Sequence, residues 1–272
     1  PKEPLAWKAA AEAQGAGPFY RGFEVHRDLP KKSLLAGEKS EGSAAPPNTF
    51  TEKEIWNHGT DFLLGMQDES GGFTDSDYDF GGTDSLPNVH VAITALAGMA
   101  MVEALQRPDC SERLKRRLPT AIKRAIEFTT DDSRINPIDR DEILWAYAFR
   151  LRFLSRCLEI PPSNIKVSKG DLKLSQQRTV ELLEGVQSRG GGWYHEYNNP
   201  FVTATALVAL EEAKSMGAKI DSTKIEKGLE SLLSDRFANG AFPYSSGRKK
   251  RNSAGTEKDF AASAGRMPLC EL

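Results

Sequence analysis

Several features that would assign the chain to a particular class of protein are missing. Its most apolar stretch, residues 89–102, is shorter than the about 20 residues that span a bilayer, so no transmembrane segment is predicted. The three cysteines are widely spaced and odd in number, which is typical neither of a disulfide framework nor of a cysteine-rich zinc site. A formal net charge of −2 and a pI near 6.2 argue against a general surface for nucleic acids.

Catalytic and metal-binding signatures are also sparse. No Gly-x-Ser-x-Gly elbow, phosphate-binding loop or dinucleotide fingerprint occurs. The run Asp75-x-Asp77-x-Asp79 begins like a calcium-binding EF-hand loop, but Phe80 and Leu86 stand where that loop has Gly and Glu. A solvated acidic turn is therefore expected, with a loose calcium loop as the alternative. No cofactor and no metal are predicted.

The beginning of the chain differs in character from the rest. Residues 1–48 are rich in Ala, Gly, Pro and Lys and have little periodicity, so we expect an extended arm there. Residues 49–272 carry the apolar spacing of helices, and we expect one all-α repeat domain with a solvated basic loop at residues 248–251. The sequence begins at Pro1 without Met and stops within an apolar stretch, so we expect the remainder of a longer chain, and no localisation is predicted.

A pattern that recurs at long spacing is the most informative feature. A helix ends in Gln, a Gly-rich turn with a closing aromatic follows, and an almost wholly apolar helix begins. A weaker copy without the Gln runs over residues 227–242, and a degenerate unit over residues 121–137. Such recurrence predicts a repeat architecture. The turn residues of the two clearest copies are Gln67, Gly72 and Phe73, and Gln187, Gly192 and Trp193.

Each part of this pattern has a structural use. Glycine can end a helix in a left-handed conformation without the steric penalty of a Cβ atom. The Gln side chain can bond backbone groups that are left unpaired at a helix end, and the aromatic ring covers the turn. We therefore interpret the pattern as a device of stability, not of catalysis.

The pattern resembles the QW-type repeat of the squalene cyclase and protein prenyltransferase superfamily. The matching residues are Gly59, Phe62, Leu63, Gln67, Gly72 and Phe73, and Leu182, Leu183, Gln187, Gly192 and Trp193. The resemblance implies an α/α toroid, with apolar helices in an inner ring and amphipathic helices in an outer ring. Because the sequence holds fewer hairpins than that ring needs, a partial toroid is expected. The resemblance also implies an isoprenoid or other apolar molecule in the central cavity.

Apolar helices and capping residues give the expected order of elements. The predicted inner helices are residues 89–105, 142–158 and 201–213, and a helix from about residue 260. Outer helices are predicted to start at capping boxes headed by Thr51, Asp109 and Thr223, and another is expected over residues 177–187. Charged substitutions are expected to destabilise the fold at Ile93, Leu96 and Leu207.

The candidate site lies at the mouth where the inner helices begin. Its residues are Asp84, His90, Tyr147, His195 and Glu196. Asp84 and Glu196 both precede inner helices of like direction, so we expect them at one end of the domain. A carboxylate there, screened by Tyr147 and Trp193, would have a raised pKa and could act as an acid. The alternative is that these side chains only cap helices and satisfy loop backbone.

Two functions stay open. Class II terpene cyclases resemble one another in an Asp-x-Asp-Asp acid and protein prenyltransferases in an Asp-x-Cys zinc unit, and neither occurs here. Aromatic side chains could line a cavity and stabilise cations, or could simply be core: Trp145, Tyr147, Phe149, Trp193 and Tyr194. The chain is therefore interpreted as a cyclase- or prenyltransferase-like protein that binds or acts on an isoprenoid. The alternative is a non-catalytic binding or scaffold module.

Overall fold

The computed structural model describes residues 51–74, 86–245, 254–264 and 267–270. The expected arm, the acidic run at residues 75–79 and the basic run at residues 248–251 lie outside these described residues. The described chain is helical, which confirms the all-α prediction. Its helices are α3 (Glu52–Met66), α4 (Leu86–Gln106), α5 (Glu112–Thr130), the 3₁₀-helix η1 (Asp132–Arg134), α6 (Ile143–Glu159), α7 (Pro162–Ile165), α8 (Lys169–Gly185), α9 (Pro200–Ser215), α10 (Ser222–Asp235), α11 (Glu257–Ser263) and α12 (Met267–Cys270).

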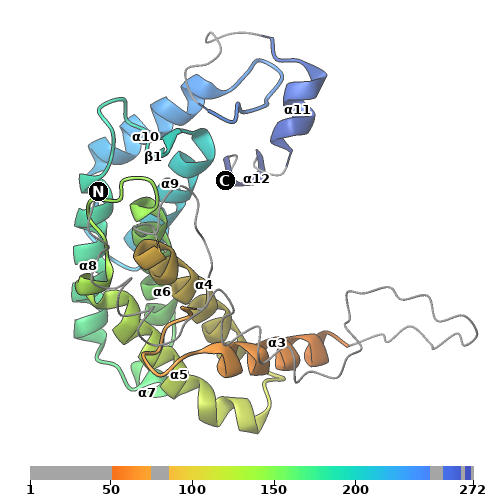
Figure 1. Ribbon diagram of the computed structural model, residues 1–272, viewed down its shortest axis with the longest axis vertical. Coiled ribbons are helices and arrows are strands. Elements are labelled where there is room, and N and C mark those ends of the chain that lie inside the picture. Colours follow the sequence, from red (N-terminus) through yellow and green to blue (C-terminus); the bar gives the residue numbers. More distant parts are fainter. Residues whose placement is uncertain (1–50, 75–85, 246–253, 265–266, 271–272) are drawn as a thin grey trace, which may run out of the picture.

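The helices form two rows along an open arc (Figure 1). On the concave side α4 packs against α6, α6 against α9, and α9 against α12. On the convex side α5 packs on α4, α8 on α6 and α10 on α9. The described chain therefore repeats a unit of one outer and one inner helix, as the recurring sequence pattern predicts.

The inner helix α4 is apolar on almost every side. It has 21 residues, and by length and composition alone it could cross a membrane, with a mean hydropathy of 1.5 over its best window. The helix is longer than the apolar stretch at residues 89–102, so its length alone does not test the expectation of no transmembrane segment, which stays a prediction. A buried core helix meets the same criteria, and 56% of that window is buried in the fold. Contacts with α5 and α6 account for this burial.

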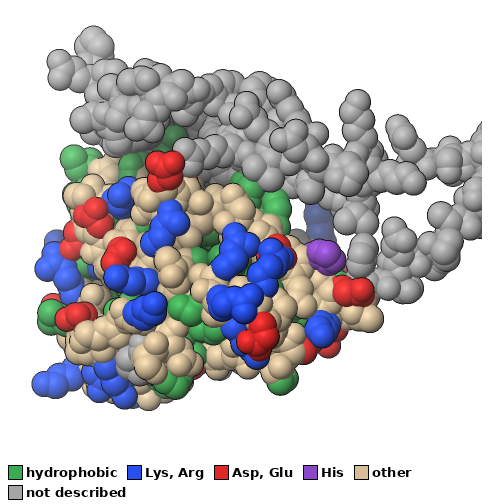
Figure 2. Space-filling model, turned by 90° about the horizontal axis from the view of Figure 1, so that it is seen from below, with side chains coloured by type: hydrophobic (Ala, Val, Ile, Leu, Met, Phe, Trp, Pro, Cys, Tyr) green, Lys and Arg blue, Asp and Glu red, His purple; other side chains and the backbone are tan. Residues whose placement is uncertain are grey.

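The outer helix α5 is amphipathic and carries its charges outward. Figure 2 views the molecule from below, the end of the arc where α3, α5 and α7 lie, and shows Lys and Arg side chains interspersed with Asp and Glu. Several of these charges are paired locally: Arg117 lies 3.6 Å from Asp61, and Lys115 lies 2.9 Å from Glu112. Such exposed pairs contribute little stability, so burial of the opposite, apolar side holds α5 in place.

The ends of α3 and α8 carry the same hydrogen-bonded turn. Gln67 donates through Nε2 to a carbonyl of its own turn at 2.9 Å and to the Ala121 carbonyl of α5 at 2.9 Å. Gln187 donates in the same way to its own turn at 2.7 Å and to the Lys224 carbonyl of α10 at 2.8 Å. Each glutamine therefore closes its turn and joins its outer helix to the next outer helix.

Close contacts explain the glycine and the aromatic ring of this turn. Gly191 has a φ of 87°, and a Cβ atom there would stand 2.3 Å from the Lys227 carbonyl oxygen. The fully buried Trp193 donates from its backbone to Thr203 Oγ1 at 3.1 Å and from Nε1 to the Leu183 carbonyl at 2.8 Å. The ring thereby fixes the turn between the end of α8 and the start of α9.

The weaker third copy adopts the turn without its glutamine. The Phe237 amide donates to the Ala241 carbonyl at 2.8 Å, and Gly240 has a φ of 87°. Phe242, only 2% exposed, takes the place of the closing aromatic. The degenerate unit over residues 121–137 forms η1 instead of this turn.

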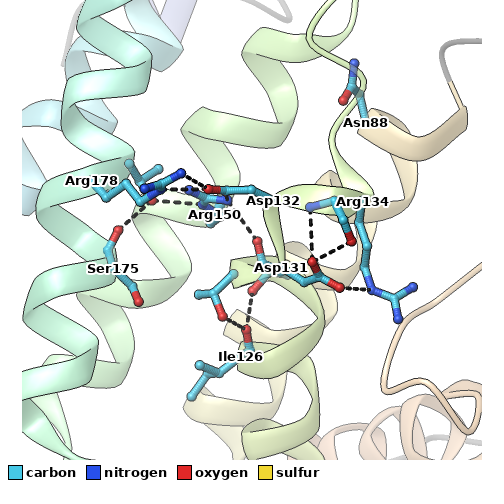
Figure 3. Close-up of polar contacts among 12 residues, drawn as sticks. Asn88, Ile126, Asp131, Asp132, Arg134, Arg150, Ser175 and Arg178 are labelled. Atoms are coloured by element: carbon cyan, nitrogen blue, oxygen red, sulfur yellow. Dashed lines mark hydrogen bonds and ion pairs between the residues drawn. The ribbon is translucent and has the colours of Figure 1, made fainter.

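A buried arginine joins the middle of the two rows (Figure 3). The Arg150 side chain of α6 is 2% exposed and donates to Asp132 at 2.8 Å and to Thr179 of α8 at 2.8 Å. Arg178 of α8 also donates to Asp132, at 2.6 Å. Burial alone would raise the pKa of Asp132, but the bonds from the two guanidinium groups outweigh it and hold this pKa below its ordinary value.

Inner helices α4 and α6 approach closely at one glycine. A Cβ atom on Gly98 would lie 2.5 Å from the ring of Phe153, which is fully buried. The absence of a side chain at Gly98 therefore allows this ring to lie directly against the α4 backbone.

The positions at which the helices begin differ in part from the sequence prediction. The capping box at Thr51 is confirmed. Ser111, not Asp109, caps α5, because the Asp109 carboxylate is bonded to a neighbouring guanidinium. Asp221, not Thr223, caps α10 and accepts from the Thr223 amide at 2.9 Å. In both cases the cap lies close to the predicted residue, but a different side chain reaches the unpaired amides.

Three other expectations are corrected. Helix α8 starts at Lys169, well before the predicted residue 177, because Ser168 caps it and its first turns are polar. The helix expected from about residue 260 is instead α11 and α12. Leu96 is 43% exposed, whereas Leu207 is 6% exposed. The prediction that Leu96 is buried was wrong because one side of α4 has no covering helix among the described residues.

Candidate functional site

Four rings, here called the aromatic cluster, lie together at the start of the inner helices. They belong to Trp145 and Phe149 of α6, Phe201 of α9, and His195. The ring centroid of Trp145 is 5.9 Å from that of Phe149, 5.7 Å from that of Phe201 and 5.3 Å from that of His195. All four residues are partly exposed.

The aromatic cluster faces away from the outer row. Trp145, Phe149 and Arg152 follow one another along one side of α6 at helical spacing. Arg152 forms a two-bond ion pair, at 2.9 Å for each bond, with Glu212 of the neighbouring inner helix α9. Arg150, on the other side of α6, bonds to the outer helix α8. The cluster therefore lies on the concave side of the arc, and Arg152 and Glu212 follow it along that side.

The loop before α6 is held by a buried side chain of α4. Asn88 donates to the Asn136 carbonyl at 3.0 Å and to the Asp139 carboxylate at 2.8 Å. Asp139 in turn accepts from the backbone amides of Asp141 at 3.1 Å and Glu142 at 3.3 Å. This bonded loop fixes the approach to α6 and thereby the groups around His195.

A small antiparallel hairpin brings His195 to the cluster. Its strands are β1 (Tyr194–His195) and β2 (Tyr197–Asn198), with His195 opposite Tyr197. Glu196 occupies the tip with a φ of 54° and is exposed. Because successive strand residues point to opposite faces, the side chains of Tyr194 and His195 lie on opposite faces of the hairpin.

His195 has three polar neighbours on one side of its ring. Its Nδ1 lies 2.8 Å from the Asp141 carbonyl oxygen, 3.3 Å from Trp145 Nε1 and 3.7 Å from a Glu142 carboxylate oxygen. One nitrogen cannot donate to a carbonyl and accept from an indole at the same time. The shorter contact favours Nδ1–H donating to Asp141, which leaves Nε2 as the acceptor of the neutral ring.

The predicted site residues are only partly brought together. His195 and Glu196 share the hairpin, with one side chain at the cluster and the other in solvent. His90 lies half-buried near the start of α4. Asp84 lies outside the described residues. The same-end placement of Asp84 and Glu196 therefore stays a prediction.

Tyr147 and Trp193 lie in the core and not beside the aromatic cluster. Tyr147 is 5% exposed, and the Arg150 guanidinium lies 6.0 Å from its ring centre. Burial raises the pKa of this phenol. Trp193 is fully buried. Tyr147 is three positions before Arg150, which lies over its ring and bonds to α8, so Tyr147 is on the side of α6 away from His195.

Sequence reasoning missed the buried carboxylate beside His195. Glu142 is 4% exposed and directly precedes the first residue of α6. A carboxylate directly before the apolar first turns of α6 is the signal that could have identified it. Its proximity to His195 could not be read from the sequence, because the two residues are joined only by the hairpin's position in the fold.

The described residues offer no conventional metal or thiol centre. Within them no group of three or more His, Cys, Asp or Glu side chains could hold a metal ion. The cysteines Cys110, Cys157 and Cys270 are free and buried. Burial raises the pKa of the Cys157 thiol far above its usual range, which makes it a poor nucleophile.

No family model, curated protein or solved structure matches the chain. The family resemblance therefore rests on the repeat residues of the sequence alone.

Proposed function

We propose that the chain is an α/α-toroid repeat protein of the squalene cyclase and prenyltransferase kind, and that it binds an isoprenoid or similar apolar molecule on its concave side. Two observations support the arrangement: inner and outer helices alternate along the arc, and one turn recurs at the ends of outer helices. A toroid built in this way would place the concave side around its central cavity.

The aromatic cluster is the observation that carries the proposal. Large rings in the concave row that remain partly exposed provide apolar area for a ligand. Trp145, Phe149 and Phe201 would contact the hydrocarbon, and their faces could also stabilise a positive charge on it. Leu96 of α4, which is 43% exposed, is a further exposed apolar side chain of the inner row.

His195 is the polar group that the proposal places beside the ligand. Its bond to the Asp141 carbonyl fixes the ring, and the buried Glu142 carboxylate is 3.7 Å from Nδ1. Such a pair could bind a hydroxyl group or move a proton. Asp84, His90 and Glu196 stay predictions for the same end of the domain.

Binding without turnover is the form of the proposal that the sequence favours, because the Asp-x-Asp-Asp acid and the Asp-x-Cys zinc unit are both absent. Catalysis at the cluster is the alternative. A product formed from a bound isoprenoid would establish the enzyme, and saturable binding without a product would establish the binding module.

The test is a calorimetric titration of the whole chain with farnesol, compared with W145A, F149A and L174A variants. Leu174 is a matched control because it is an apolar residue of the outer helix α8 and is 73% exposed. Loss of a buried aromatic contact should weaken farnesol about tenfold or more in W145A and F149A, and L174A should bind like the original chain.

Folding is controlled by comparing melting temperatures and by the variant W145L, which keeps an apolar side chain. Saturable binding that weakens only in the cluster variants supports the proposal. Absence of saturable farnesol binding, or equal losses in W145A and L174A, would refute it.

A further inference from the structure

A separate cavity of about 750 Å³ lies where α8 ends and α6 begins. Its walls are the loop before α6, the first residues of α6, the end of α8 with the following turn, and Tyr194 of the hairpin. The volume falls within the range of about 300–1,000 Å³ that is typical of small-molecule sites.

The hairpin separates this cavity from the aromatic cluster. Tyr194 lines the cavity, while the next residue, His195, contacts Trp145 of the cluster. The alternation of side chains along a strand places these two residues on opposite faces. The cavity is therefore a second site on the other side of the hairpin, although the carbonyl oxygen of Asp141, which lines it, also lies 2.8 Å from His195 Nδ1.

Two of the residues that line the cavity are arginines. Arg140 and Arg189 both line it, both are exposed, and neither has a hydrogen-bond or ion-pair partner within the described chain. Two guanidinium groups offer more donors than one carboxylate needs and suit the oxygens of a phosphate dianion.

The other lining groups define the rest of a ligand. The Asp141 carboxylate repels a purely anionic molecule and requires a partner with hydroxyl or amino donors. Tyr194 is 40% exposed and has no ring partner in the described chain. Ile143, Leu144 and Val186 form an apolar floor. A planar aromatic group could stack on the tyrosine above this floor.

We propose that this cavity binds a nucleoside monophosphate. The two arginines would hold the phosphate, Asp141 would accept from ribose hydroxyls or a base amine, and Tyr194 would stack on the base. The cavity uses neither a phosphate-binding loop nor a dinucleotide fingerprint, so no short motif of the sequence reveals it.

The test titrates the whole chain calorimetrically with AMP, adenosine and ribose 5-phosphate. AMP should bind best, because adenosine lacks the phosphate and ribose 5-phosphate lacks the base. The variants R140Q and R189Q should each bind AMP about tenfold or more weakly than the original chain, since each loses a charge-assisted bond. The variant Y194A should bind AMP more weakly, and its affinity for ribose 5-phosphate should be unchanged.

The matched control is R116Q, because Arg116 is an exposed arginine of α5 without a hydrogen-bond or ion-pair partner in the described chain. None of these arginines supports the fold through a described bond, so melting temperatures should be unchanged. Absence of AMP binding, equal affinity for AMP and ribose 5-phosphate, or equal losses in R116Q and R189Q would each overturn the proposal.

Discussion

Nε2 of Gln187 lies 2.8 Å from the carbonyl oxygen of Lys224, and this hydrogen bond crosses from the outer helix α8 to the outer helix α10. The first turn makes the equivalent connection from α3 to α5. The recurring glutamine therefore holds two successive units together in addition to ending a helix. Its recurrence within one sequence is explained by this double use.

Replacing Gln187 by Ala should lower the free energy of unfolding by about 1–3 kcal/mol, because two backbone carbonyls lose their donor. Urea unfolding would measure the change. The control is Q106A, since Gln106 is exposed at the end of α4. Equal stability of the two variants would show that the two hydrogen bonds of Gln187 contribute nothing to stability.

Two glycines near the same turn should respond in opposite ways. Gly191→Ala should destabilise by about 2 kcal/mol or more, because its φ is 87° and its Cβ would meet the Lys227 carbonyl at 2.3 Å. Gly185→Ala lies at the end of α8 with no atom within 4 Å of the new Cβ. It should be neutral or stabilising by up to about 1 kcal/mol. Thermal unfolding of both variants distinguishes these outcomes, and similar shifts would contradict the turn geometry.

Charge should be tolerated at one inner-helix leucine and not at the other. Leu207→Glu should destabilise by about 3 kcal/mol or more because it places a carboxylate in the core. Leu96→Glu should change stability by about 0.5 kcal/mol or less, since this side chain is 43% exposed. Chemical denaturation of both variants measures the difference, and a large loss in L96E would mean that α4 is covered on its concave side.

Asp132 should make the free energy of unfolding depend on pH in the acid range. Its pKa is lowered in the folded chain, so its contribution is complete above its unfolded pKa of about 3.9 and is lost as the pH falls through its folded pKa. The Asp132→Asn variant should therefore have a lower free energy of unfolding than the original chain at pH 7. The difference between the two free energies should become smaller toward about pH 3. Urea unfolding across this pH range tests the expectation, with the exposed Glu230→Gln as control. If the difference in unfolding free energy between the two chains stays constant across this pH range, Asp132 does not contribute to the loss of stability in acid.

The repeating turns could be predicted from sequence because their chemistry is local. Gly191 needs a positive φ, and Trp193 follows within the same turn, so spacing alone defines the unit. The partner carbonyl of Gln187 could not be predicted in the same way. It belongs to Lys224 on a helix that follows much later in the chain. Only packing brings this carbonyl oxygen to 2.8 Å from Nε2 of Gln187.

The candidate site was less predictable because it depends on which side of a helix faces which row. Trp145 and Tyr147 are two positions apart, yet the first joins the concave cluster and the second packs toward α8. The sequence around α6 is apolar on several sides, so periodicity does not separate these directions. The spacing of the repeats predicted that His195 lies near the start of an inner helix. It did not predict that Glu142 lies beside His195, because the two residues come together only through the fold.

The contact between Gly98 and Phe153 has a consequence for how this sequence can evolve. The ring occupies the space that any side chain at position 98 would need, since a Cβ atom there would come within 2.5 Å of it. A larger residue there is accessible only after position 153 has become smaller, and a smaller residue at 153 alone leaves a void. Mutational paths through the α4–α6 interface must therefore change both positions together or pass through a destabilised intermediate.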